Sequence, residues 1–79
     1  MTRYYFHVLD GTAITDETGE EFPDIKAAKA EAVKPASGLL ADGLGETFWQ
    51  GHPWQIVVSD SASPERGRIF FSLTLSVHE

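Results

Sequence analysis

The C-terminal part of the chain alternates between apolar and polar side chains. From residue 68 to residue 77 every odd position is apolar, and the even positions are polar apart from Phe70. A period of two places successive side chains on opposite faces of a β-strand. We therefore predict a strand over residues 68–77 whose core face carries Ile69, Phe71, Leu73, Leu75 and Val77.

Three further strands are expected. Residues 3–9 and 54–59 are rich in aromatic and β-branched residues, which favour strands. Alternation assigns to the core Tyr4, Phe6 and Val8 in the first of these segments and Trp54, Ile56 and Val58 in the second. Asp10 and Gly11 form a hairpin turn pair, so a short strand over residues 12–15 should return antiparallel to the first strand.

A helix is predicted between Asp24 and Gly43. Asp24 is a suitable N-cap, and Gly43 followed by Leu44 is a termination signal in which Leu44 folds back on Leu39. At about 100° per residue, one apolar stripe holds Ile25, Ala28, Ala32, Ala36 and Leu39. Pro35 interrupts this pattern, and because the stripe resumes in phase after it, we expect one kinked helix rather than two short helices.

Together these elements predict a single small α+β domain over residues 1–79. The order β-β-α-β-β favours a two-layer sandwich, with a four-stranded, mainly antiparallel sheet and one kinked helix on one face. The most buried positions should be the core-face strand residues up to Leu75, together with Ile25, Ala28, Ala32 and Leu39. Residues 45–53 are predicted to form a loop that carries Phe48 and Trp49. With Trp54, these rings should close one end of the core; the alternative is an aromatic surface for a ligand or partner.

The first part of the chain carries a series of short motifs. Residues 3–11 read R-Y-Y-F-H-V-L-D-G, residues 16–19 read D-E-T-G, and residues 22–25 lead into an alanine-rich segment over 27–32. This series resembles a family of short bacterial proteins of unknown function, which open with R-Y-F-F-H-x-x-D-G and continue with D-x-x-G. The resemblance implies the fold but no mechanism, because that family has no established activity. The tripeptide at residues 22–24, F-P-D, is also similar to a segment of HicB-like antitoxins.

The chain is short and acidic. Its 79 residues include 12 acidic and 6 basic side chains, and its formal net charge is −6. Because Lys and Arg supply most of the affinity for nucleic acids and anionic lipids, we expect neither as a partner. The sequence has no apolar run near the ~18 residues of a membrane-spanning helix, no signal-peptide layout and no cysteine. We therefore expect a cytoplasmic protein.

Residues with catalytic or ligating potential are few. His7 is a candidate proton carrier or metal ligand, but we favour the alternative that it bonds a neighbouring strand or loop. His52 and His78 do not add zinc-site spacing. The acidic run at residues 16–21 is a candidate cation site, but it departs from the calcium-loop pattern and is better explained as a solvated turn. With no phosphate loop and no nucleophile elbow, we expect no catalytic residue, no cofactor, no metal and no enzymatic activity.

The sheet face opposite the predicted helix is partly apolar. Alternation assigns to this open face Tyr5, His7, Leu9, Val57 and Phe70. Exposed aromatic patches usually mark interfaces, and a lone core of under about 80 residues supplies little stability. We therefore expect a protein-interaction module that forms a homodimer through this face or through an edge strand. The candidate interface residues are Tyr5, His7, Val57 and Phe70.

An alternative function follows from the clustering of the acidic residues. Six of them fall within residues 10–24, a segment without Lys or Arg. Such a segment favours positively charged partners. The alternative is therefore an antitoxin-like regulatory protein that binds a basic partner protein.

Overall fold

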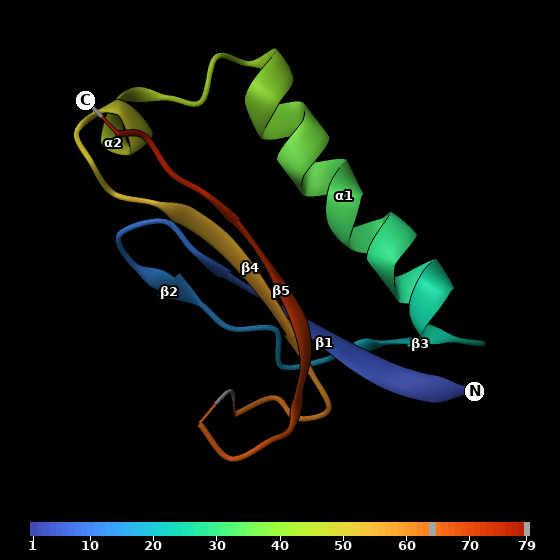
Figure 1. Cartoon of the computed structure of the whole chain (residues 1–79). Helices are drawn as coiled ribbons and strands as arrows, with labels where there is room; N and C mark the ends of the chain where they lie inside the picture. The colour runs from blue at the N-terminus through green and yellow to red at the C-terminus, as the bar shows by residue number, and fades with distance from the viewer. Residues whose placement is uncertain (64, 79) are drawn as a thin grey trace.

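The computed structural model describes residues 1–63 and 65–78. In chain order its elements are β1 (Thr2–Leu9), β2 (Ala13–Ile14), β3 (Glu20–Phe22), α1 (Ile25–Ala41), α2 (Glu46–Trp49), β4 (Trp54–Ser59) and β5 (Ile69–Leu75). The strand pairs are antiparallel, with the order β2-β1-β4-β5 and with β3 also paired to β1. The helix α1 runs along one side of this sheet (Figure 1). The predicted α+β fold, with one helix packed on a mostly antiparallel sheet, is confirmed.

The structure adds two short elements to the predicted order. Strand β3 pairs with the start of β1, from Thr2 opposite Phe22 to Tyr4 opposite Glu20. Its acidic residues are poor strand formers, so local propensity does not reveal it. Helix α2 lies within the segment predicted as a loop, and the predicted second strand is reduced to the two residues of β2.

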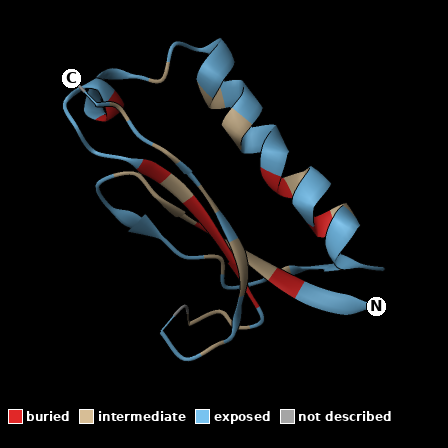
Figure 2. Cartoon of the chain, viewed as in Figure 1, coloured by how far each residue is buried: buried red, intermediate tan, exposed pale blue. Residues whose placement is uncertain are grey.

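The core lies between α1 and the facing side of the sheet (Figure 2). Its buried apolar residues are Tyr4, Ala28, Ala32, Phe48, Trp54, Ile56 and Val58. Partly buried side chains pack around them, among them Phe6, Val8, Leu39, Phe71, Leu73 and Leu75. Ala28 and Ala32 are fully buried because a methyl side chain lets the helix backbone approach the sheet closely. Most of the predicted core is therefore confirmed.

The predictions for two residues near helix ends are wrong: Ile25 was expected in the core, and Trp49 was expected to close one end of it. Ile25 is 40% exposed, since it is the first residue of α1 and lies one turn before Ala28, where the helix reaches the core. Trp49 is 54% exposed, whereas Phe48 and Trp54 are buried as predicted. Neighbouring residues of a helix point about 100° apart, so the short α2 cannot turn both rings inward.

A β-bulge breaks the alternation of the last strand. Val58 pairs with Phe71, but the next residue of β4, Ser59, pairs with Ile69. Phe70 is therefore an extra residue in β5, and two residues of this strand oppose one residue of β4. The alternation predicted from the sequence holds only on the C-terminal side of this bulge.

The bulge reverses two predicted side-chain positions. The Phe70 ring lies on the core side, with its centroid 5.0 Å from that of Tyr4. Ile69, which shares the face of its partner Ser59, is 55% exposed. The predictions of a core Ile69 and of an open-face Phe70 are wrong, because a change of register moves side chains to the other face of a sheet.

The predicted signals at both ends of α1 are confirmed. The Asp24 carboxylate accepts a hydrogen bond from the amide of Ala27 at 2.9 Å. At the C-terminal end, the amide of Leu44 donates to the carbonyl of Leu39 at 2.9 Å, as in a Schellman cap. Between these ends α1 is one helix that continues through Pro35. No helix in the part of the chain that the structure describes is long and apolar enough to cross a membrane.

Candidate interaction surface

The structure does not bring the four predicted interface residues together on one exposed face. His7 and Val57 lie on the open face, but they are only 2% and 8% exposed within a single chain. Tyr5 is half-buried, and its ring lies close to Gly19: a Cβ atom added to Gly19 would be 2.9 Å from the Tyr5 ring. Phe70 lies on the core side of the sheet. The open face is therefore not the apolar patch that alternation predicts.

His7 joins the open face to the two segments that cover it. The Asp16 amide donates to His7 Nδ1 at 3.1 Å, so this nitrogen carries a lone pair. The opposite nitrogen, Nε2, lies 3.0 Å from both Ser59 Oγ and the Ser61 carbonyl oxygen. These partners assign the neutral ring with its proton on Nε2. The favoured interpretation of His7, in which it bonds a neighbouring strand or loop, is confirmed.

The Asp16 carboxylate stabilises the same region through backbone amides. Its Oδ1 accepts hydrogen bonds from Thr18 and Gly19, and its Oδ2 accepts one from Phe6 at 3.1 Å. Burial tends to raise the pKa of Asp16, but the amides of Gly19, Phe6 and Thr18 outweigh it and hold the pKa below its ordinary value. The acidic turn at this position therefore has a structural role.

The two edges of the sheet differ in their protection. On one edge, β1 is covered by β2 and β3, and between them the Asp16 side chain accepts the amide hydrogen of Phe6. These edge strands have two and three residues, and β3 carries Glu20 and Glu21. Short strands, charges and side-chain caps are the usual means by which sheet edges are protected from further pairing.

The opposite edge, β5, has none of these three protections, although a bulge lies near its N-terminal end. Among the described residues, β5 pairs with β4 alone. It is seven residues long and contains no charged residue and no proline. A groove of about 390 Å³ runs between this strand and α1, lined by Lys29, Val33, Phe71, Ser72 and Leu73. Apolar side chains therefore lie beside a row of backbone groups that is open to pairing.

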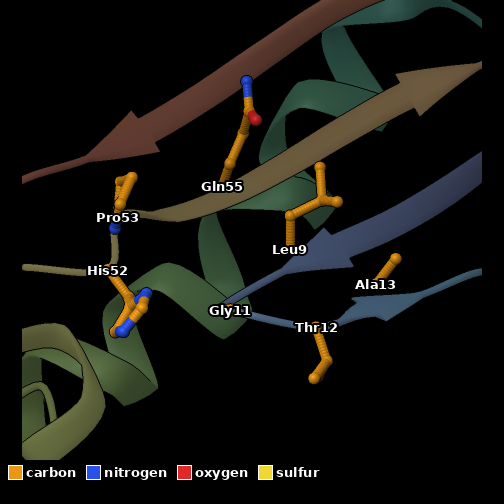
Figure 3. A pocket seen from close by; sticks show the side chains of 7 residues that line it. All are labelled: Leu9, Gly11, Thr12, Ala13, His52, Pro53 and Gln55. Atoms are coloured by element: carbon orange, nitrogen blue, oxygen red, sulfur yellow. The ribbon is translucent and has the colours of Figure 1, made fainter.

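A second hollow lies at the other end of the sheet (Figure 3). It has a volume of about 330 Å³ and is lined by Leu9, Gly11, Thr12, Ala13, His52, Pro53 and Gln55. These residues come from the β1–β2 hairpin and from the start of β4, and none of them is buried. Ligand sites normally hold a few precisely placed polar groups in an enclosed setting, so we do not assign a binding function to this hollow.

The structure gives no support to the metal-binding alternative. Both ring nitrogens of His7 already have hydrogen-bond partners. Within residues 1–63 and 65–78, no group of three or more His, Asp or Glu side chains is arranged to hold a metal ion.

A family model matches residues 3–76, which is nearly the whole chain. The protein belongs to the DUF6894 family. DUF6894 is described as a domain of unknown function, so the resemblance to proteins of unknown function is confirmed and no activity follows from it. Bacterial origin stays a prediction. No curated protein and no solved structure matches the chain.

Sequence reasoning identified most residues of the open face, with Phe70 and Ile69 as the exceptions, but it missed the features that cover this face. Ser59 and Ser61 are more than 50 residues from His7, and no local pattern links them. The unprotected edge, by contrast, has a sequence signal: no charged residue lies between Arg68 and His78. That signal, combined with the sheet order, would have pointed to β5.

Proposed function

We propose that this DUF6894 protein is a protein-interaction module that self-associates through the free edge of β5. The observation that carries the proposal is the difference between the two sheet edges. One edge is closed by two short strands, of which β3 carries two glutamates, whereas the other presents a long, uncharged strand. An exposed hydrophobic edge strand is a template for pairing with another chain.

The charge distribution supports a second copy as the partner. Each chain carries a net charge of −6, so two copies repel unless their acidic segments stay apart. The acidic residues of β3 and of the preceding turn lie on the edge opposite β5. Pairing through β5 keeps these segments at the two far ends of the joined sheet, and it brings together strands without charge.

The open sheet face supports self-association less well. His7, Val57 and Ser59 are already buried within one chain, so a partner would gain little apolar contact from them. Of the two modes of association predicted from the sequence, edge pairing is therefore the one we propose. Tyr5 is set apart from this contact, and Phe70 packs against Tyr4 on the core side of the sheet.

The experiment compares the mass of wild type and of Thr74→Lys by sedimentation velocity or light scattering at micromolar concentration. Thr74 is exposed in β5, so the substitution should leave the fold intact. Wild type should have twice the mass of one chain, and Thr74→Lys should be a monomer because a lysine in an edge strand disfavours pairing with a further strand. The matched control is Ala13→Lys on the protected edge, which should remain a dimer.

Two results would overturn this proposal. A wild-type monomer throughout the micromolar range would exclude self-association as the function. A dimer that survives Thr74→Lys with unchanged affinity would place the contact elsewhere. Phe70→Glu is not a suitable probe, because Phe70 packs against Tyr4 and its loss would unfold the core.

The antitoxin-like alternative, binding to a basic protein, stays a prediction. Part of the acidic segment already makes contacts within the chain: the carboxylates of Asp16 and Asp24 accept hydrogen bonds from backbone amides. Arg3 donates to the Thr18 carbonyl oxygen and lies 3.9 Å from Glu21. These contacts make the segment a weaker argument for a basic partner than β5 is for a second copy.

A further inference from the structure

The free edge also carries information on how two copies would align. We propose that β5 pairs antiparallel with β5 of a second copy about a two-fold axis at Thr74. This inference rests on the proposed self-association and adds the register, that is, which residues of the two chains meet.

The first argument is a near-symmetry in the sequence of the edge. Residues 71–77 read F-S-L-T-L-S-V, which is almost the same in both directions from Thr74. In antiparallel pairing about this residue, Thr74 meets Thr74 of the second copy. The remaining pairs join similar side chains: Leu73 with Leu75, Ser72 with Ser76, and Phe71 with Val77. Thr–Thr pairs and pairs of aromatic with β-branched residues stabilise antiparallel sheets.

The second argument is that each of these pairs lies on a single face. Residues paired across an antiparallel ladder point to the same side of the sheet. Phe71, Leu73, Leu75 and Val77 all pack against the core cluster. Ser72, Thr74 and Ser76 are exposed. The register about Thr74 therefore joins core side to core side and polar side to polar side over the whole of residues 71–77.

The bulge at Phe70 disfavours the neighbouring registers. Pairing about Ser72 would set Ile69, which faces the open side, against Leu75 of the core side. Pairing about Leu73 would set Phe70, which lies on the core side, against the exposed Ser76. In the register about Ser72, paired residues would share a face only over residues 71–73. In the register about Leu73, they would share a face only over residues 71–75. The register about Thr74 avoids these mismatches, because it lies entirely on the regular side of the bulge.

This register would also complete the apolar groove beside β5. A two-fold axis perpendicular to the sheet places both α1 helices on the same face of the joined sheet. Leu75 and Val77 of the second copy would then lie beside Leu73 and Phe71, which line the groove under α1. The second copy would extend the apolar floor of each groove. Val77 lies two residues beyond Leu75, the last residue paired with β4, so the contact would lengthen β5.

Single cysteines test the register, because the natural chain has none. The variants are Ser72→Cys and Thr74→Cys, at exposed positions of β5, and Ser76→Cys, at the exposed position that follows its last residue. Directly paired residues have Cα atoms about 4.5–5.5 Å apart, which lies within the range of about 4.4–6.8 Å that a disulfide spans. Residues offset by four positions are about 13 Å apart, too far for a disulfide.

Each variant is oxidised with diamide in the native state and analysed on a non-reducing gel. Thr74→Cys alone should form a covalent dimer, as expected for a pair within disulfide range. Ser72→Cys and Ser76→Cys should remain uncross-linked alone and should form a heterodisulfide when mixed. Ala13→Cys on the protected edge is the control and should not cross-link.

The outcomes separate this inference from the proposed function. Self-cross-linking of Ser72→Cys, or cross-linking of Ser72→Cys with Thr74→Cys only, would keep the β5 contact and overturn the register. Self-cross-linking of all three variants would show that the contact has no single antiparallel register and would also overturn the inference. A non-covalent dimer in which none of the variants cross-links would overturn the register together with the β5 contact, and a wild-type monomer would overturn the proposed function itself.

Discussion

At the scale of single residues, His7 shows how a candidate functional group becomes part of the structure. A mid-strand histidine on the predicted open face suggests proton transfer or metal binding. In the structure its ring is buried, and each nitrogen bonds a segment distant in sequence. Alternation correctly placed His7 on the face opposite the core. Its partners could not be predicted, because they come from loops whose paths depend on the tertiary fold.

Asp16 offers a test of the same loop through pH. Its folded-state pKa is lowered, so its stabilising effect is present above the unfolded value of about 3.9 and is lost as pH falls through the folded-state pKa. Asp16→Asn should lower the free energy of unfolding by about 1–3 kcal/mol at neutral pH. The reason is that the asparagine NH₂ group would face the amide of Phe6 where Oδ2 now accepts.

The measurement is urea unfolding of both proteins between pH 7 and pH 2. The difference between wild type and Asp16→Asn should shrink below about pH 4 as the wild-type carboxylate is protonated. Glu17→Gln, at the exposed neighbouring position, is the control and should follow wild type. A difference that stays constant with pH would show that the charge of Asp16 does not stabilise the loop.

At the scale of elements, the sequence correctly predicted the features that depend on interactions between residues close together in the chain. The cap at Asp24, the stop at Gly43 and the alanine stripe of α1 all depend on neighbours within one or two helical turns. The bulge at Phe70 and strand β3 depend instead on pairing with β4 and β1. The alternation breaks at Phe70, but this break alone could not reveal the bulge, because the bulge is created by pairing with the partner strand.

Pro35 provides the prediction for this scale. Since α1 continues through it, the proline removes one helical amide and leaves the Glu31 carbonyl without the usual donor from residue 35. Pro35→Ala should raise the free energy of unfolding by about 1–3 kcal/mol, which corresponds to a higher melting temperature. Ser37→Ala, also exposed in α1, is the control for helix propensity alone and should change stability by a few tenths of a kcal/mol.

Thermal unfolding followed by circular dichroism decides this point. The expected order of melting temperatures is Pro35→Ala above Ser37→Ala, with Ser37→Ala close to wild type. A melting temperature of Pro35→Ala at or below that of wild type would mean that the proline ring contributes packing that offsets the lost amide. That contact would be in the groove it lines with Phe6 and Ile56.

At the scale of the whole molecule, the difference between the two sheet edges is the feature of the fold on which the proposed self-association rests. Apart from Ala28 and Ala32, no residue of α1 is fully buried, so one helix supplies only a thin second layer. Small domains of this kind often rely on association for stability. The sequence indicated self-association from the apolar side chains assigned to the open face and from the small size of the chain, but the edge on which the proposal rests emerged only from the strand order. Propensity does not specify which strand ends a sheet.

The last prediction follows from mass action. If folding and dimerisation are linked, stability depends on protein concentration, and a hundredfold change is worth about 2.7 kcal/mol per dimer. This free energy is shared between two chains, and a domain of this size changes its melting temperature by about 4–8 °C per kcal/mol. The melting temperature should therefore fall by several degrees between 100 µM and 1 µM. Thr74→Lys should melt at a single temperature across that range, no higher than wild type at its lowest concentration. A wild-type melting temperature that does not change with concentration would show that the β5 contact contributes nothing to the stability of the fold.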